Sequence, residues 1–398
     1  MKITNVESFL MSCPLPEPLK LPFYGGERTI LKRDAMLVKV STDAGLCGFG
    51  PGPASEQAHQ EINQQVRARL VGQELAGWAG LREAAGAAEI ALLDLAGKAE
   101  GRPVSELLGG RVRDTIRLYG SAGMYMSPQG YAEEAAGIAA MGFSAYKMRP
   151  GLGPEKDLET VRLMRQAVGP GVGLMVDAHT WWRMGDSSYN FDTVAQLSRQ
   201  MAAYNPFWLE EPLPPEDHDS YRRLRGVAPF PLASGEHEHT LDGFLDLITT
   251  RAVDFVQADV CCQGGFAMGE RIFAAAAAHN VKFAFHSWGT RLEVLAAAHL
   301  GITRPESIVE WLEFPCHSRP GRVGMYPFDL AEEILAEPLA IEGGELMVPR
   351  TPGLGLRVDE TVVHRYPYQP GPWSFFRLDS PAETYAVISD HSVKFLKQ

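Results

Sequence analysis

The sequence predicts an α/β protein built around a (β/α)₈ (TIM) barrel, preceded by an α+β domain and followed by a C-terminal segment. Between residues 116 and 340, eight short apolar runs alternate with helix-length stretches at a spacing of about 25–30 residues. Outside this region the sequence has strand-like segments and turns without that spacing. We therefore expect three parts, residues 1–115, 116–340 and 341–398.

The first part begins with strands and continues with a helix. Residues 36–42 alternate as a half-buried strand does, and residues 43–45 form a turn after them. Residues 84–100 are rich in Ala and Leu, which is typical of a helix, and Gly101-Arg102-Pro103 ends it. Strands together with a helix indicate an α+β domain.

The apolar runs are the expected barrel strands. They cover residues 116–120, 145–148, 173–176, 207–209, 232–234, 255–258, 281–285 and 307–309. A doubly wound parallel sheet is the alternative, but it would have fewer units and usually a Gly-rich phosphate turn. Neither such a turn nor a P-loop occurs. After residue 341 short strands return, and a Pro- and aromatic-rich tail is expected to pack on the N-terminal domain or on another subunit.

Composition excludes several classes of protein. The net charge of −12 argues against nucleic acid as a partner. No window approaches the roughly 20 apolar residues of a membrane span, and the N-terminus lacks the apolar run of a signal peptide. The five cysteines include no C-x-x-C pair and are odd in number, which indicates reduced thiols and a cytoplasmic location.

Charged and polar residues gather where the apolar runs end. They are Lys147, Arg149, Asp177, His179, Glu210, Glu211, Glu236, His237, Asp259, His286 and Glu310. Because the carboxyl ends of barrel strands converge on one mouth, these side chains should meet in one site.

Asp177, Glu210 and Glu236 follow three consecutive runs. Crowded carboxylates repel one another, and a divalent cation relieves the repulsion. An all-oxygen ligand set suits Mg²⁺. The sequence therefore predicts a magnesium site.

Asp259 and His286 end the next two runs and could act as an orienting carboxylate with an imidazole base. Lys147 and Arg149 are two residues apart and share one strand face, where cations could neutralise an enolate or bind a carboxylate. Arg149 is a poor general base, because a guanidinium keeps its proton at any working pH.

These motifs together resemble the enolase superfamily, mandelate racemase subgroup, over nearly the whole chain. The motifs are 88–98 (AEIALLDLAGK), 147–149 (KMR), 176–179 (VDAH), 208–212 (WLEEP), 234–237 (SGEH), 257–259 (QAD) and 285–288 (FHSW). The resemblance implies a modified barrel under an α+β capping domain built from both chain ends. It also implies Asp177, Glu210 and Glu236 as Mg²⁺ ligands, Asp259 and His286 as the base dyad, and Glu310 as an acid on the substrate carboxylate.

Two departures from the family pattern narrow the expected reaction. Arg149 stands where family racemases typically have a second lysine, and a racemase needs a base on both faces of the α-carbon. His179 stands where many members have Asn, and in galactonate-type dehydratases such a histidine protonates the departing 3-hydroxyl. Residues 235–238 (GEHE) also resemble rhamnonate dehydratases.

The resemblance therefore implies an aldonate-type acid-sugar dehydratase, a hydro-lyase that gives a 2-keto-3-deoxy acid. Lys147 and Glu310 would help to stabilise the enediolate, while Arg149 and His237 would bind substrate oxygens. In the capping domain, Tyr24, Arg28 and Arg33 are candidates for the distal hydroxyls. A homo-oligomer, a dimer or an octamer, is expected. The alternatives are an epimerase, racemase or cycloisomerase of acid sugars, and a non-catalytic, metal-stabilised sugar-acid binder.

Overall fold

The computed structural model describes residues 1–317, 328–389 and 392–396, and one of its two sheets closes into the predicted barrel. Each barrel strand is parallel to the next, and the last strand pairs back with the first through Leu312 and Leu118. The barrel strands are β4 (Thr115–Met124), β5 (Ala145–Arg149), β6 (Gly173–Asp177), β7 (Trp208–Glu210), β8 (Leu232–Ser234), β9 (Phe255–Ala258), β10 (Lys282–Phe285) and β11 (Val309–Pro315).

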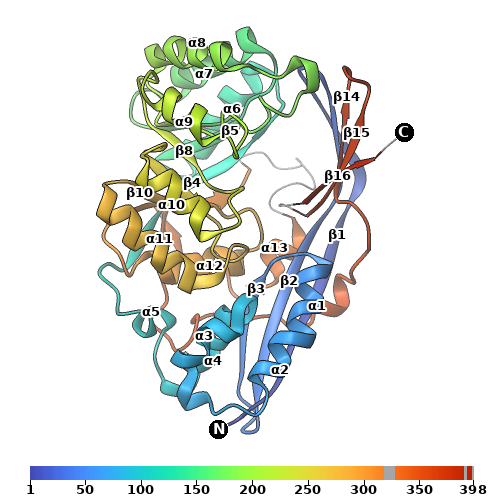
Figure 1. Ribbon diagram of the computed structural model, residues 1–398, viewed down its shortest axis with the longest axis vertical. Helices are drawn as coiled ribbons and strands as arrows, with labels where there is room; N and C mark the ends of the chain where they lie inside the picture. Colours follow the sequence, from blue (N-terminus) through green and yellow to red (C-terminus); the bar gives the residue numbers. More distant parts are fainter. Residues whose placement is uncertain (318–327, 390–391, 397–398) are drawn as a thin grey trace.

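A helix follows each of the first seven barrel strands. These helices are α6 (Pro128–Ala140), α7 (Pro154–Val168), α8 (Phe191–Met201), α9 (His218–Arg225), α10 (Leu241–Thr249), α11 (Gly265–His279) and α12 (Arg291–Gly301). The short helix α13 (Asp329–Glu333) comes after β11. Figure 1 shows the helices arranged around the outside of the strands.

One apolar residue from every barrel strand contributes to a cluster inside the barrel. The cluster consists of Tyr119, Ala145, Met175, Trp208, Ala233, Phe255, Ala284 and Trp311. Side chains alternate along a strand, so the residue two positions further also faces the interior, one layer nearer the mouth. This layer contains Lys147, Asp177, Glu210 and His286, which places polar side chains on top of an apolar plug.

The predicted eighth strand, residues 307–309, is wrong in its limits. The observed strand β11 runs from Val309 to Pro315, and its register sets Phe285 of β10 beside Leu312. The sequence pattern predicts that the apolar run ends at Glu310, but the strand continues through Glu310 and Glu313. The carboxyl end of β11 therefore lies further along the chain than expected.

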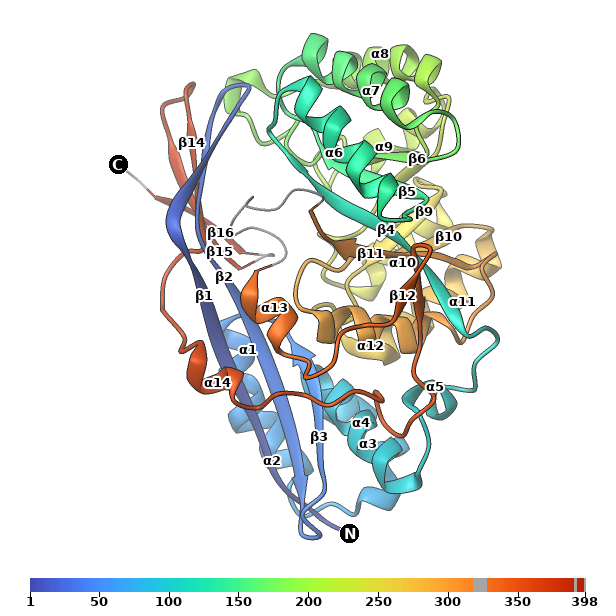
Figure 2. The same cartoon turned by 180° about the vertical axis from the view of Figure 1, so that it is seen from behind.

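The second sheet is antiparallel and combines both ends of the chain, as expected for the capping domain. Its strands are β1 (Ile3–Phe23), β2 (Gly26–Thr42), β3 (Cys47–Gly52), β14 (Ser374–Leu378), β15 (Thr384–Ser389) and β16 (Ser392–Leu396). Figures 1 and 2 show the long blue strands β1 and β2 running beside the barrel, with the red strands β14 and β15 at one end of the same sheet.

Most helices of the N-terminal part pack against this sheet. The helices of this part are α1 (Glu56–Glu61), a π-helical turn (Ile62–Val66), α2 (Arg67–Leu70), α3 (Trp78–Ala85), α4 (Glu89–Glu100) and α5 (Val104–Leu107). Of these, α3 and α5 pack on other helices. Gly48 allows β3 to approach α4 closely, since a Cβ there would lie 2.2 Å from the carbonyl oxygen of Ala91. Within the described residues, no helix combines the length and the apolar character needed to cross a bilayer.

The last part of the chain first returns to the barrel. Strand β12 (Ile341–Glu342) pairs with β13 (Glu345–Met347), which pairs antiparallel with the barrel strand β4. The chain then passes through α14 (Val362–Arg365) to β14. The predicted third part, 341–398, therefore touches the barrel sheet before it joins the capping sheet. The limits 1–115, 116–340 and 341–398 stay predictions.

Asp94 joins three parts of the chain at one buried point. One oxygen of its carboxylate accepts a hydrogen bond from the Leu354 amide at 2.7 Å, and the other accepts from the Phe49 amide at 2.7 Å. Lys98 donates to Asp94 at 2.6 Å. This carboxylate therefore ties helix α4 both to strand β3 and to the C-terminal segment.

We expect the Asp94→Asn variant to lower the free energy of unfolding by about 3 kcal/mol, because an amide cannot accept all three hydrogen bonds and leaves buried donors unpaired. Urea titration followed by circular dichroism measures this. Glu83→Gln, on the exposed face of helix α3, is the control and should change stability by less than about 0.5 kcal/mol. Equal stability of the two variants would contradict this role of Asp94.

Candidate active site

The predicted strand-end residues, with the exception of Glu310, meet at the mouth of the barrel, around the amine of Lys147. Its Nζ lies 2.6 Å from Glu210 Oε1, 3.0 Å from Glu313 Oε1 and 3.5 Å from Asp177 Oδ2. Lys147 is fully buried. Burial lowers the pKa of Lys147, but the carboxylates of Glu210 and Glu313 outweigh this effect and raise it well above its ordinary value. Lys147 is therefore a permanent cation at the centre of the site.

The three predicted metal ligands lie together and fit a divalent cation. One oxygen of each of Asp177, Glu210 and Glu236 lies within 4.8 Å of the others, and all three residues are buried. Burial raises the pKa of Glu236 to about 8, and repulsion from Glu211 and Asp177 contributes to this rise. A cation bound between the carboxylates would relieve that repulsion. The all-oxygen donor set is the kind that Mg²⁺ and Ca²⁺ prefer.

Glu236 also lies near a second group of possible ligands, Glu211 and His237. His237 Nδ1 lies 2.6 Å from Glu211 Oε2, and its Nε2 accepts a hydrogen bond from Arg183. A guanidinium can only donate, so the imidazole proton is on Nδ1 and the Nε2 lone pair is occupied. His237 therefore has no free lone pair for a metal, and the all-oxygen group is the better site.

His286 and Asp259 form the predicted imidazole–carboxylate pair. Nδ1 of His286 lies 3.2 Å from Asp259 Oδ2, and the amides of Cys261 and Cys262 donate to the other oxygen of Asp259. Nε2 of His286 faces the carboxylates of Glu236 and Glu313 at 3.4 and 3.8 Å. Burial lowers the pKa of His286, but these carboxylates outweigh it and raise the pKa to about 10. A cation among the carboxylates would bring this pKa down toward neutrality.

A second imidazole, His179, faces the same cavity. Its Nδ1 lies 2.7 Å from Asp177 Oδ1, which leaves Nε2 for a ligand. Burial lowers the pKa of His179 to about 3, although the Asp177 carboxylate opposes the shift. An anion bound beside it would raise this pKa again.

Glu310, predicted as the acid of the eighth strand, does not lie in the site. Its carboxylate pairs at 2.5 Å with Lys282, the first residue of strand β10, at the opposite end of the barrel from the mouth. Glu313 lies in the site instead, because it is two residues beyond the interior-facing Trp311. Sequence reasoning missed Glu313 because it ended the strand at residue 309, six residues before its observed end at Pro315.

Glu313 is held by a dense set of donors. Its Oε1 receives hydrogen bonds from Ser121 at 2.5 Å and Arg149 at 3.2 Å, and its Oε2 receives one from the Ser287 amide at 3.1 Å. Burial raises its pKa, but Lys147, His286 and Arg149 outweigh burial and lower the pKa to about 2. Glu313 is therefore an ionised acceptor at neutral pH.

A cavity opens above these groups, between the barrel mouth and the capping sheet. It is lined by Arg28, Met124, Arg149, His179, Arg183, Glu236, His237, His286, Trp288, Trp373 and Val387. Arg149 and His237, predicted to contact substrate, both line it. Arg149 is already neutralised, since its Nε lies 3.2 Å from Asp177 Oδ2.

Of the capping-domain residues predicted to contact the distal hydroxyls of the substrate, only one lines the cavity. Tyr24 is 48% exposed and lies at the β1–β2 turn, outside the lining. Arg33 is buried behind the lining, where it donates to the Trp288 carbonyl at 2.9 Å and stacks on Trp373. Arg28 reaches the cavity itself. Arg183 was missed, although it closely follows the 176–179 motif in the sequence.

Comparison with known proteins finds a family match for the N-terminal region and another for the barrel region. A family model described as enolase C-terminal domain-like matches residues 130–362, and the mandelate racemase / muconate lactonizing enzyme N-terminal domain matches residues 10–109. D-galactarolactone cycloisomerase of Agrobacterium fabrum is 31% identical over 395 residues, covering 92% of this chain and 99% of that protein. L-rhamnonate dehydratase of Saccharopolyspora erythraea is 34% identical over 292 residues, covering 71% of this chain and 68% of that protein.

Solved structures agree with these matches. The 3,6-anhydro-D-galactonate cycloisomerase of Zobellia galactanivorans superposes with a TM-score of 0.74 at 29% identity, covering 92% of this chain and 99% of that one. A member of the enolase superfamily from Polaromonas sp. JS666 superposes with a TM-score of 0.78 at 28% identity, covering 94% and 99%.

We expect the Glu236→Gln variant to bind Mg²⁺ at least about tenfold more weakly than the wild type, because one ionised ligand is lost. Isothermal titration calorimetry on EDTA-treated protein measures this, and Mg²⁺ should also raise the melting temperature of the wild type more than that of Glu236→Gln. Glu342→Gln, on the exposed strand β12, is the control. Unchanged affinity in Glu236→Gln would remove Glu236 from the ligand set.

Proposed function

The chain belongs to the mandelate racemase / muconate lactonizing enzyme family of the enolase superfamily, and from this premise we propose that it is an acid-sugar dehydratase. In this reaction the proton next to the substrate carboxylate is removed and the neighbouring 3-hydroxyl leaves as water. The product is a 2-keto-3-deoxy acid. The substrate is a small sugar acid of the aldonate type.

One observation carries the proposal. His286, oriented by Asp259, lines a cavity together with Glu236, directly above the buried carboxylates that surround the cation Lys147. A base is needed to remove an α-proton, and fixed positive charge is needed where the carboxylate becomes an enediolate. When bound at Asp177, Glu210 and Glu236, Mg²⁺ would stabilise the negative charge that develops on the substrate carboxylate.

The first step uses His286 as the base. Its Nε2 takes the α-proton, and Asp259 holds the ring and stabilises the imidazolium through Nδ1. Lys147 lies where the substrate carboxylate would gather charge and donates to it, while the ionised Glu313 keeps Lys147 and Arg149 in position. Glu313 thus takes the place on the eighth strand that was expected for Glu310, as a positioning carboxylate and not as an acid on the substrate.

The second step uses His179 as the acid. It lies in the same cavity, and its bond to Asp177 leaves Nε2 to face the substrate. The anionic substrate raises the pKa of His179 above the value of about 3 that burial imposes in the free protein. The imidazolium then donates a proton to the departing 3-hydroxyl, and the enol tautomerises to the ketone.

A cycloisomerase is the second candidate, and the relative from Agrobacterium fabrum supports it. If the leaving oxygen belongs to a ring of the substrate, the same elimination opens the ring and the mass does not change. Mass spectrometry therefore separates the two reactions. An epimerase or racemase is less well supported, because Arg149, whose pKa is raised further by Asp177 against the effect of burial, cannot serve as a second base.

A non-catalytic sugar-acid binder would not need the His286–Asp259 pair, and a turnover screen with aldonic and aldaric acids tests for it. We also propose a cytoplasmic location, supported by five cysteines that are all free thiols. A homo-oligomer stays a prediction of the family resemblance.

We expect Glu313→Gln to lower kcat/KM at least about 100-fold, because loss of its charge disturbs both Lys147 and Arg149. Glu310→Gln is the matched control at the other end of the same strand and should stay within about threefold of wild type. Steady-state kinetics on the best substrate of the screen measures both. If Glu310→Gln lost more activity than Glu313→Gln, Glu310 rather than Glu313 would be the carboxylate that acts in the site.

The variants His179→Asn and His286→Asn should block different steps of the reaction, the loss of the 3-hydroxyl and the removal of the α-proton. In D₂O, His179→Asn should form little product, yet the recovered substrate should carry deuterium at the α-carbon, because His286 still removes the α-proton, exchanges it with the solvent and returns a deuteron. His286→Asn should give neither product nor exchange. NMR and mass spectrometry of the recovered substrate measure both results. If His179→Asn dehydrates at close to the normal rate, His179 is not the acid, and His286 must serve both steps.

A further inference from the structure

Two arginines face the cavity without a carboxylate partner. Arg28 comes from strand β2 of the capping sheet, and Arg183 comes from the loop after strand β6. Neither forms an ion pair with any acidic residue in the described part of the chain. Arg149, which lines the same cavity, is paired with both Asp177 and Glu313. The cavity therefore has an acidic side at the barrel mouth and a basic side without counter-charge.

Arg28 is only 6% exposed, and its Nε has no hydrogen-bond partner among the described residues. Its guanidinium lies 4.9 Å from the ring centre of Trp373 and 4.8 Å from that of Phe376, and one NH group points to the sulfur of Met124. Burial lowers the pKa of Arg28, and the nearby Arg183 lowers it further. A guanidinium nevertheless stays charged, so a buried cation remains uncompensated.

Arg183 is half-buried and is also held by neutral groups. It donates to His237 Nε2, and its guanidinium lies 4.3 Å from the ring centre of Trp182. His237 is the neutral tautomer in this contact, because it accepts from Arg183 and donates to Glu211. These contacts orient Arg183 and leave its charge available to a ligand.

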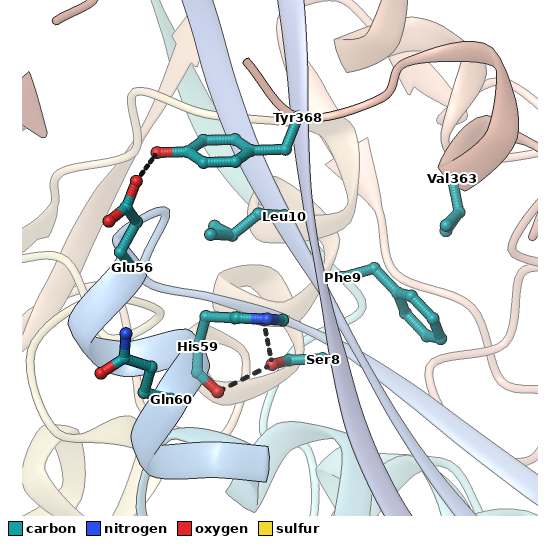
Figure 3. Close-up of a pocket in the computed structure, with 8 residues that line it drawn as sticks. All are labelled: Ser8, Phe9, Leu10, Glu56, His59, Gln60, Val363 and Tyr368. Carbon is teal, nitrogen blue, oxygen red and sulfur yellow. Dashed lines mark hydrogen bonds between the residues drawn. The ribbon is translucent and has the colours of Figure 1, made fainter. Parts of the chain in front are cut away.

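Another pocket of the molecule provides a contrast (Figure 3). It lies between strand β1, helix α1 and the C-terminal segment. There Tyr368 donates to Glu56 at 3.0 Å, and Ser8 Oγ lies 3.0 Å from His59 Nδ1. In that pocket these four polar side chains bind one another in pairs, whereas Arg28 and Arg183 have no acidic partner among the described residues.

We propose that Arg28 and Arg183 bind a second, terminal carboxylate of the substrate, so that the preferred substrate is a sugar diacid. This inference rests on the proposed function and specifies its substrate class. One carboxylate of the diacid lies at the acidic side, beside Lys147 and the proposed metal site. The other end lies between Arg28 of the capping sheet and Arg183 of the loop after β6, which neutralise it.

A carboxylate suits the side of the cavity at Arg28 and Arg183 better than a hydroxyl does. A neutral hydroxyl would leave the buried charge of Arg28 and the half-buried charge of Arg183 uncompensated, and uncompensated buried charge is costly. A carboxylate accepts parallel hydrogen bonds from a guanidinium edge. The rings of Trp373 and Phe376 bound the guanidinium of Arg28, and this packing limits the reorganisation that binding requires.

Binding of unreactive acids tests the site apart from turnover. Adipate has a carboxylate at both ends, and 6-hydroxyhexanoate has one carboxylate and one hydroxyl over the same chain length. Calorimetry on the Mg²⁺-supplemented wild type should show adipate binding roughly 10- to 100-fold more tightly. In Arg28→Met and in Arg183→Met, the difference should fall below about threefold.

Arg377→Met is the matched control. Arg377 is exposed on strand β14, next to Phe376, and removal of its charge should leave the preference for adipate unchanged. Melting temperatures establish that each variant is folded. If Arg28→Met does not fold, the comparison of adipate with 6-hydroxyhexanoate is made on Arg183→Met alone, because Arg183 is only half-buried.

Turnover then tests the substrate class. Each aldarate is compared with the aldonate that differs only in a terminal hydroxymethyl group, and with that aldonate phosphorylated at the same end. The wild type should favour the aldarate in kcat/KM, and Arg183→Met should lose this preference mainly through KM. A wild type that favours the aldonate or its phosphate overturns the inference and leaves the dehydratase proposal standing. If no sugar acid reacts but adipate binding depends on both arginines, the terminal-carboxylate site stands and the dehydratase proposal fails.

Discussion

The buried ammonium group of Lys147 is the contact on which the site depends. It lies among Glu210, Glu313 and Asp177 at the top of the barrel, where water does not screen charge. Without this cation, the carboxylates of neighbouring strands would repel one another and take up protons. With it, Glu313 and Asp177 stay ionised, whereas burial and repulsion from Glu211 and Asp177 still raise the pKa of Glu236 to about 8. A divalent cation bound between the carboxylates would relieve that repulsion.

The barrel supplies the positions for these charges. One apolar side chain from each strand fills the interior, and the next interior-facing residue of most strands is polar. Trp208 shows how closely the layers are linked, because its indole donates to Glu210 at 3.0 Å from the apolar layer below. A dense plug under the charges excludes water from one side and keeps the polar side chains in one orientation.

The capping sheet closes the other side of the cavity and adds a different kind of charge. Its strands come from both ends of the chain, and Asp94 fastens the C-terminal segment to the N-terminal helices. Through this arrangement, Arg28 from strand β2 and Trp373 next to strand β14 reach the same cavity as His286. The barrel thus carries the reacting groups, and the capping sheet carries groups suited to recognise the far end of a ligand.

The sequence alone determined the barrel, the carboxylate cluster and the pairing of Asp259 with His286, because each of these follows an apolar run that ends in a polar residue. It did not determine which glutamate of strand β11 faces the site. Glu310 and Glu313 both alternate with apolar residues, and only the register with β10 and β4 shows which one is level with His286. It also could not show that Arg28 and Arg183 lack acidic partners, since charge compensation between distant residues depends on how the chain folds. Local pattern decides which residues end a strand, whereas tertiary packing decides which charges meet and which remain unpaired.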